Sequence, residues 1–227
     1  MNVSQPEPSV KYPRTLHLHW SDTIGDDGDH VLESLRAFEG QEIVATEKLD
    51  GENTTLYRTH LHARSLDSGH HPSRGWIKNF HARLAPHIPS GVRINGENMF
   101  ALHSIPYESL PSYFLVFGIW RGDVLLSWDE TTQMCADLET SSGELLPTVP
   151  VLYRGEWNEK TVRALYPRPS QFGSTSEGYV VRLARSFGRG EWNQSVAKYV
   201  RPRHVQTGPH WMQKPVEKNG LRSPEVA

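Results

Sequence analysis

The sequence of 227 residues contains a single cysteine, Cys135. One cysteine excludes an intrachain disulfide and a zinc site built from cysteines, and it fits a protein of a reducing compartment. No stretch approaches the roughly 18 apolar residues that a membrane-spanning helix needs. The N-terminus also lacks the apolar core of a signal peptide. We therefore expect a cytoplasmic protein with no membrane partner.

An excess of positive charge is also missing, since 24 Lys and Arg residues stand against 26 Asp and Glu residues, a net charge of −2. A near-neutral total neither predicts nor excludes a nucleic-acid partner, because a local basic groove can exist on a chain of balanced charge. The length is sufficient for one domain with a substantial core. We expect a single domain over residues 1–227, with a loose lead-in at 1–14 and a polar tail at 202–227.

Hydrophobic periodicity and turn signals predict an irregular mixture of strands and helices. The expected strands cover residues 42–49, 53–57, 93–98, 113–120, 178–183 and 195–200. The expected helices cover residues 31–38, 73–84, 129–138 and 159–166. Because these elements do not alternate in regular strand–helix–strand units, we predict an α+β fold with mainly antiparallel sheets.

The segment Lys48-Leu49-Asp50-Gly51 is the most informative feature of the chain. Asp50-Gly51 is a turn signal between two predicted strands, which suggests a hairpin. Because side chains alternate along a strand, Lys48 and Asp50 are expected to point to the same face. Two interpretations stay open at this point: a nucleophilic lysine with a neighbouring carboxylate, or an ordinary ion pair on a hairpin.

Further charged residues interrupt or border other predicted strands: Glu97, Glu177 and Lys198. Burial of an unpaired charge costs several kcal/mol, so these groups either face solvent or line a polar cleft. Lysines and acids together in one cleft suit a nucleoside triphosphate with a metal ion, because the lysines offset phosphate charge and the carboxylates hold Mg²⁺.

The order of these motifs resembles the covalent nucleotidyltransferases, the group of DNA ligases, RNA ligases and mRNA capping enzymes. In chain order, the motifs are Lys-x-Asp-Gly at Lys48, Gly-Glu at Glu97, an apolar strand with Phe117, Glu-Gly-Tyr-Val-Val-Arg at Glu177, and an apolar strand with Lys198. Within the group the chain is most similar to RNA ligases of the phage RNA ligase 2 type, over about residues 42–201. The resemblance implies a ligase adenylylation domain of two mainly antiparallel sheets, flanked by helices, with the nucleotide cleft between them.

The resemblance also implies an activity. Lys48 is expected to attack ATP and form lysyl-AMP, with Asp50 and Lys198 as further catalytic residues. The AMP then passes to a 5′-phosphate, and a 3′-hydroxyl displaces it to join two RNA ends, or the ends of an RNA/DNA hybrid. Glu177 resembles the acid that binds the metal, Mg²⁺ or Mn²⁺.

The remaining nucleotide-binding positions are carried over from matching motifs. Phe117 is expected to stack on adenine and Glu97 to bind the ribose, whereas the same strand contexts also fit a core aromatic and a solvated acid. The other expected contacts to the base, the phosphates or the 5′-phosphate are Thr46, Glu47, Asn53, Arg64 and Arg201.

The chain departs from the family pattern at Val200, where related ligases often carry a second lysine. Arg201 is one residue further along and would face the other way on a regular strand. We also expect no appended C-terminal domain, which counts against a DNA ligase or a capping enzyme.

Two rival functions stay open. One is another nucleotidyltransferase of the group, acting on DNA nicks or using GTP on RNA 5′ ends. The other is a nucleic-acid-binding protein that keeps the fold without catalysis. A set of basic residues is consistent with either an RNA-binding face or an ordinary solvated surface: Lys11, Arg14, Arg74, Lys78 and Arg83. The oligomeric state does not follow from the sequence.

Overall fold

The computed structural model describes residues 7–21, 30–66, 71–202 and 215–223. Within these residues the strands form a five-stranded sheet, here called sheet A, and a six-stranded sheet, sheet B. Sheet A has the order β1 (Leu16–His17), β11 (Val196–Val200), β9 (Gly178–Leu183), β2 (Glu42–Lys48) and β8 (Val151–Glu156). Sheet B has the order β10 (Phe187–Gly188), β7 (Val124–Leu125), β6 (Phe114–Arg121), β5 (Val92–Asn98), β3 (Glu52–Leu56) and β4 (Leu61–Ala63).

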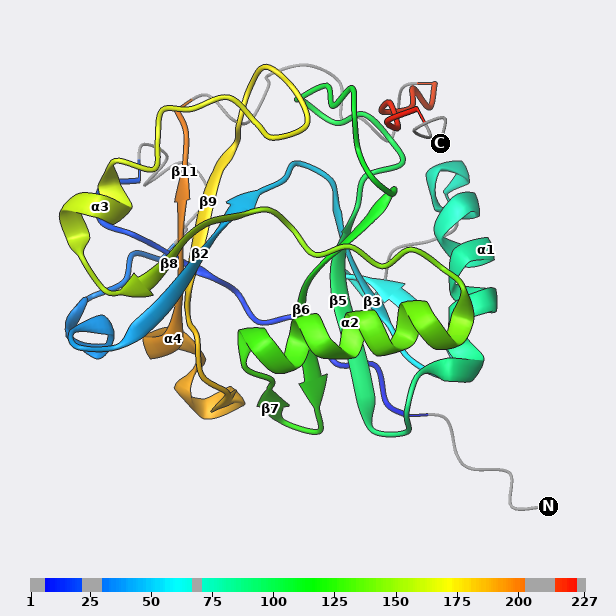
Figure 1. The fold of residues 1–227 in the computed structure, drawn as a ribbon, viewed down its shortest axis with the longest axis horizontal. Helices are drawn as coiled ribbons and strands as arrows, with labels where there is room; N and C mark the ends of the chain where they lie inside the picture. Colours follow the sequence, from blue (N-terminus) through cyan, green and yellow to red (C-terminus); the bar gives the residue numbers. More distant parts are fainter. Residues whose placement is uncertain (1–6, 22–29, 67–70, 203–214, 224–227) are drawn as a thin grey trace.

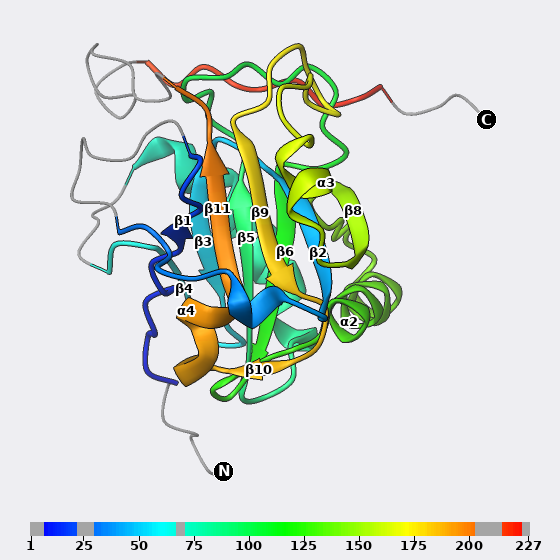
Figure 2. The ribbon, with the colours of Figure 1, turned by 90° about the vertical axis from the view of Figure 1, so that its left-hand side faces the viewer.

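The two sheets lie against each other, with sheet A on the left of Figure 1 and sheet B on the right. Seen from the left, β11, β9 and β2 lie in front of β3, β5 and β6 (Figure 2). Strand pairs are antiparallel except for the parallel pair β1–β11. The predicted α+β class with two mainly antiparallel sheets is therefore confirmed.

Helices flank the sheets. The α-helices are α1 (Gly75–Leu84), α2 (Trp128–Ser142), α3 (Glu159–Arg163) and α4 (Trp192–Ser195). Short 3-10 helices are η1 (Arg36–Phe38), η2 (Pro72–Arg74), η3 (Ala85–His87) and η4 (Arg189–Glu191). Helices α1 and α2 cover the outer face of sheet B, and α3 lies beside β8 (Figure 1). No helix among the described residues is both long and apolar enough to cross a membrane.

The spacing of apolar residues in α1 explains why this helix packs on sheet B. Ile77, Phe80 and Leu84 recur at helical spacing, are buried, and pack with Ile94 and Phe114 of sheet B into one hydrophobic cluster. Helix α2 joins the same cluster, and it begins where the sequence offers a capping box, at Ser127. The two predicted helices over these residues are thus confirmed.

The predicted helix over residues 31–38 is wrong. Val31 forms a parallel bridge with His17, and the backbone N–H of Leu32 donates to the carbonyl of His17 at 2.7 Å. The buried Leu32 and Phe38 contact the core cluster of sheet A. The apolar spacing therefore reflects packing of an extended segment, and helical structure is limited to η1.

The predicted hairpin at Lys48 is also wrong, although both of its strands exist. Strand β2 belongs to sheet A and β3 belongs to sheet B. Asp50 and Gly51 therefore carry the chain from one sheet to the other. A Cβ on Gly51 would lie 2.7 Å from the Asn98 carbonyl oxygen, so this close crossing requires glycine.

Residues 7–15, here called the strap, differ from the expected loose lead-in; residues 1–6 lie outside the described part. The backbone N–H of Val10 donates to the Tyr57 hydroxyl at 2.8 Å, and the Trp192 indole donates to the Arg14 carbonyl at 2.9 Å. The Tyr12 ring makes edge contacts with Phe117 and Trp192 at 5.1 Å each. The strap therefore runs across both sheets in a fixed position.

Candidate nucleotide-binding site

A cavity of about 280 Å³ lies between the two sheets and is closed on one side by the strap. Strands of both sheets line it, and so do Tyr12 and Trp192. Eight residues singled out from the sequence also line it: Thr46, Glu47, Lys48, Asn53, Arg64, Glu97, Phe117 and Lys198. Here this cavity is called the nucleotide pocket. Its walls gather residues that are up to 186 positions apart in the chain, from Tyr12 to Lys198.

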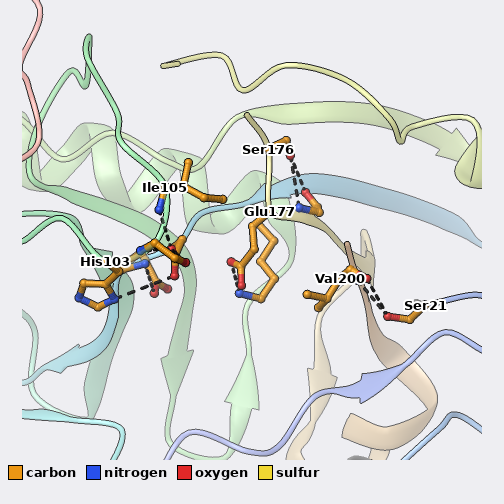
Figure 3. Close-up of polar contacts among 12 residues, drawn as sticks. Ser21, His103, Ile105, Ser176, Glu177 and Val200 are labelled. Atoms are coloured by element: carbon orange, nitrogen blue, oxygen red, sulfur yellow. Dashed lines mark hydrogen bonds and ion pairs between the residues drawn. The ribbon is translucent and has the colours of Figure 1, made fainter. Parts of the chain in front are cut away.

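Lys48 is the last residue of β2, and its register partner on β9 is Gly178. This register places the amine beside Glu177, and the two side chains form an ion pair that Figure 3 shows as a dashed line at Glu177. The Lys48 side chain is 27% exposed and that of Glu177 is 6% exposed. A Cβ on Gly178 would overlap the Tyr199 carbonyl oxygen, so glycine is needed where β9 and β11 meet beside this pair.

Burial and nearby carboxylates act on the Lys48 amine in opposite directions. Burial lowers the pKa of Lys48, whereas the Glu177 and Glu97 carboxylates raise it, and the net result is a raised pKa. The Glu177 pKa is also raised, chiefly by burial, although Lys48 and Lys198 oppose this rise. Without a bound ligand, Lys48 is therefore a protonated amine held by an acid.

Glu97 is the third ionisable group of this cluster. Its Oε1 accepts a hydrogen bond from the Gly51 backbone N–H at 3.2 Å. Burial raises the Glu97 pKa to about 8, the carboxylates of Glu177 and Asp50 add to the rise, and Lys48 opposes it. A carboxyl group that is neutral near pH 7 can donate a hydrogen bond to a hydroxyl or a phosphate oxygen.

Asp50 is turned away from the pocket toward the loop at residues 103–105. Its Oδ2 accepts from the backbone N–H groups of Ser104 at 2.8 Å and Ile105 at 3.1 Å, and also from the Ser104 hydroxyl. Figure 3 shows His103 and Ile105 on this side of Glu177. Lys48 thus has its ion pair with Glu177, and the alternative of a Lys48–Asp50 hairpin ion pair does not describe the site. Asp50 fixes the crossing between the sheets.

Three buried polar atoms at the pocket walls have no hydrogen-bond partner among the described residues. They are Glu47 Oε1, Asn53 Oδ1 and Arg182 Nη1. The other Glu47 oxygen accepts from the Gln171 backbone N–H at 3.0 Å, and burial raises the Glu47 pKa. Arg182 Nη2 donates to the Leu126 carbonyl at 2.5 Å, and burial lowers the Arg182 pKa to about 10. A buried polar atom without a hydrogen bond destabilises the folded protein unless a ligand or a water molecule forms that bond.

A sequence profile of the RNA ligase family matches residues 41–200. The chain belongs to the RNA ligase family. A Naegleria gruberi RNA ligase mutant solved with ATP and Mn is similar in fold, with a TM-score of 0.60, 18% identity, and coverage of 86% of this chain and 62% of that one. The N. gruberi enzyme with PPi gives a TM-score of 0.59 at 19% identity, with coverage of 86% and 61%. An apo mutant gives 0.57 at 20%, with coverage of 75% and 52%.

These solved RNA ligases are longer than the part that this chain matches, since the match spans about half to three-fifths of their length. No curated protein sequence matches the chain. At identities of 20% or below, these similarities establish the shared fold alone.

Not every residue expected from the RNA ligase resemblance lines the pocket. Asp50, Glu177 and Arg201 do not. Arg201 follows the end of β11, and its backbone N–H donates to the Glu177 carbonyl at 2.9 Å. Val200 is buried, and its backbone N–H donates to the Ser21 hydroxyl at 3.0 Å (Figure 3). This chain therefore has a buried apolar side chain at the position where the resemblance suggested that a second lysine is often found.

Sequence reasoning missed Tyr12, Arg182 and Trp192 as pocket residues. Arg182 lies two positions after Val180 on β9 and both line the pocket, so alternation along the strand was an available signal. Tyr12 and Trp192 had no comparable signal, because the strap and α4 reach the pocket only through the tertiary fold. The basic residues that the sequence offered as a possible RNA-binding face do not form one surface. Arg74 is buried against Glu52 and Arg83 is paired with Glu144, whereas Lys11 and Arg14 lie near the pocket mouth.

Histidine, cysteine and acidic side chains of the described residues form no group of three or more that could hold a metal ion by themselves. A Mg²⁺ ion commonly binds through one or two carboxylates, with waters and substrate phosphates completing its shell. The Glu177 carboxylate beside Lys48 fits that pattern, and so the residues present suit a metal that arrives with the nucleotide.

Proposed function

We propose that this member of the RNA ligase family is an ATP-dependent RNA ligase that forms lysyl-AMP on Lys48. The observation that carries the proposal is the position of the Lys48 amine. It lies at the end of a central strand, opens into a pocket with unsatisfied polar atoms, and contacts a buried acid. A surface lysine would have none of these surroundings.

The pocket walls suit an adenine nucleotide. The unpartnered Glu47 Oε1 can accept from the exocyclic amine of adenine, whereas guanine presents an oxygen at that position. Phe117 offers a partly exposed ring for stacking on the base, and Glu97 offers a hydrogen-bonding group for the ribose. Thr46 and Asn53 lie beside Glu47 and Lys48 on the same walls. These features support ATP over GTP as the substrate.

In the first step the neutral Lys48 amine attacks the α-phosphorus of ATP. A phosphorus–nitrogen bond forms, the bond from that phosphorus to the bridging oxygen breaks, and pyrophosphate leaves with the electron pair. The amine must first lose a proton, and the Glu177 carboxylate in contact with it is placed to take that proton. Lys198 and Arg64, which line the same pocket, offset the phosphate charge.

In the second step a 5′-phosphate oxygen attacks the same phosphorus, and Lys48 leaves as the amine. In the third step a 3′-hydroxyl attacks the activated 5′-phosphate, and AMP leaves while the new phosphodiester forms. A metal ion at Glu177 would supply charge neutralisation on the phosphates. In this proposal residues 1–227 contain one nucleotidyltransferase domain, and the protein acts in the cytoplasm on RNA ends.

The direct test is incubation with α-labelled ATP and Mg²⁺, followed by denaturing electrophoresis. We expect label on the wild-type chain and none on Lys48→Met, which keeps the side-chain volume while removing the nucleophile. Lys160→Ala is the matched control, because Lys160 is an exposed lysine on α3, and it should label like the wild type.

Two results would redirect the conclusion. Label from GTP alone would indicate a capping-type enzyme. A folded wild-type chain that takes no label from either nucleotide would contradict catalysis and favour a nucleic-acid-binding protein with the ligase fold. Joining of a 5′-phosphorylated RNA strand to a 3′-hydroxyl end, measured on single strands, nicked RNA and a nicked RNA/DNA hybrid, then identifies the substrate.

A further inference from the structure

A second cavity of about 480 Å³ opens beside the mouth of the nucleotide pocket. Its lining is strongly basic: Lys11, Tyr12, Pro13, Arg14, Arg64, Ser65 and Arg189. Here it is called the basic groove. Tyr12, Pro13, Arg14 and Arg64 line both cavities, and so the groove continues directly from the place where a nucleotide would sit.

The charge of the basic groove contrasts with that of the whole chain. Among the described residues, four cationic side chains line it and no carboxylate does, although the protein has a net charge of −2. Three arginines elsewhere in the described chain pair with carboxylates: Arg74 binds Glu52, Arg83 binds Glu144, and Arg154 binds both Asp129 and Glu42. Four like charges that share one groove repel each other, and an anionic ligand would relieve that repulsion.

These four side chains come from three separate parts of the chain, and hydrogen bonds anchor the backbone of each part. The strap carries Lys11 and Arg14, and the Arg14 carbonyl accepts from the Trp192 indole at 2.9 Å. The Arg64 N–H donates to the Asn53 carbonyl at 2.9 Å, and the Arg189 N–H donates to the Asp123 carbonyl at 2.8 Å. Because these anchors exist without a ligand, the groove is preorganised for binding.

Some of the basic side chains line the nucleotide pocket, and others line only the basic groove. Lys48, Lys198 and Arg64 line the nucleotide pocket and serve the phosphates of ATP, whereas Lys11 and Arg189 line the groove alone. A ligand that contacts Lys11 and Arg189 therefore extends past the nucleotide. A strand whose 5′-phosphate reaches lysyl-AMP has further phosphodiester groups that must lead away from Lys48.

We propose that the basic groove binds the phosphodiester backbone of the RNA strand whose 5′-phosphate accepts AMP. The inference rests on the proposed function, and it assigns to the strap a part in substrate binding. Recognition in the groove is by charge, so it is independent of the RNA sequence.

The test measures binding of a fluorescent, 5′-phosphorylated RNA single strand by anisotropy, without ATP, over a series of salt concentrations. The groove variant is Lys11→Ala/Arg189→Ala. Each lost phosphate contact should reduce the slope of log K against log salt by about 0.7 to 1. The control variant Arg36→Ala/Lys160→Ala removes the same charge from exposed residues on η1 and α3, and its slope should match that of the wild type. Thermal melting checks that both variants are folded.

An RNA affinity of the groove variant equal to that of the control would overturn the inference. A rise in the KM for ATP with unchanged RNA binding would also overturn it, because the groove would then hold the polyphosphate of the nucleotide. Labelling of the wild-type chain by ATP tests the proposed function separately. A wild type that takes no label but binds RNA through the groove would contradict the ligase proposal alone.

Discussion

At the scale of single residues, the site is a compact set of ionisable groups that alter each other's pKa. Lys48, Glu97 and Glu177 are buried or partly buried, and burial opposes the charged form of each. Lys48 and Glu177 form an ion pair, whereas Glu97 accepts a hydrogen bond only from the Gly51 N–H among the described residues. Glu97 therefore carries a cost in the ligand-free protein that a bound nucleotide would offset.

The Glu97 pKa gives a prediction about stability. It is raised from 4.5 to about 8 on folding, so the folded protein holds a proton between those pH values that the unfolded chain has released. This contribution to stability is complete below pH 4.5 and is lost as the pH rises to about 8. We expect Glu97→Gln to raise the Tm at pH 8, by roughly 2–4 °C for each kcal/mol recovered, and to change it less at pH 5.

Thermal melts of the wild type and Glu97→Gln at the two pH values measure this effect. Glu39→Gln is the control, since Glu39 is an exposed acid next to η1. A Glu97→Gln variant whose Tm gain is the same at pH 5 and pH 8 would show that the carboxyl group does not titrate in this range.

At the scale of elements, the crossing between the two sheets depends on a loop that the C-terminal segment holds. Asp50 is fixed by Ser104 and Ile105. The loop that carries them is anchored by Asn219, which accepts from the Tyr107 N–H at 3.0 Å and donates to the Met99 carbonyl at 2.8 Å. The segment 215–223, drawn in red, lies along this loop (Figure 2). A polar tail residue thus positions the turn after Lys48.

Asn219→Ala should therefore destabilise the protein. The substitution leaves buried backbone groups at Met99 and Tyr107 without partners, at a cost of roughly 2–4 kcal/mol in the free energy of unfolding. For a chain of this size the Tm should fall by roughly 5–10 °C. The control is Glu217→Ala, because Glu217 is exposed and uses its backbone carbonyl to bind the Leu102 N–H. An unchanged Tm in Asn219→Ala would show that this segment does not stabilise the loop that holds Asp50.

The elements also show where sequence reasoning succeeded. Strands β2, β5, β6, β9 and β11 and helices α1 and α2 lie where hydrophobic patterning and turn signals predicted them, and each carries buried apolar residues. The helix expected over 31–38 failed because the backbone of this segment pairs with His17, a contact that local spacing does not contain. The hairpin at Lys48 failed because a turn signal does not say whether both strands join the same sheet.

At the scale of the whole molecule, the nucleotide pocket is an interface between the two sheets. Sheet A contributes Lys48 and Lys198, sheet B contributes Glu97 and Phe117, and the strap contributes Tyr12. A ligand in this pocket contacts all three parts and binds only the folded state. Ligand binding should therefore stabilise the entire fold by mass action.

A non-transferable ATP analogue with a methylene group between the α- and β-phosphates tests this coupling without adduct formation. At a concentration of about 100 times its Kd it should add about 2.7 kcal/mol to the free energy of unfolding, a rise in Tm of roughly 5–10 °C. The corresponding GTP analogue at the same concentration should give a smaller rise, because guanine carries a carbonyl oxygen at C6, where adenine carries its exocyclic amine. Equal Tm shifts with the two analogues would contradict the assignment of Glu47 to the base. No Tm shift with either analogue would contradict nucleotide binding in the pocket.

The sequence by itself determined the chemistry that the chain has to offer. Lys48, Glu97, Glu177 and Lys198 stand out because charged residues on apolar strands require a polar cleft, and their order indicated the family. Only the tertiary structure decided which of them meet. It paired Lys48 with Glu177, turned Asp50 to the loop at Ser104, and brought the strap and its basic groove to the pocket. The physical reason is that register and sheet membership depend on contacts between distant segments, and such contacts leave no local pattern in the chain.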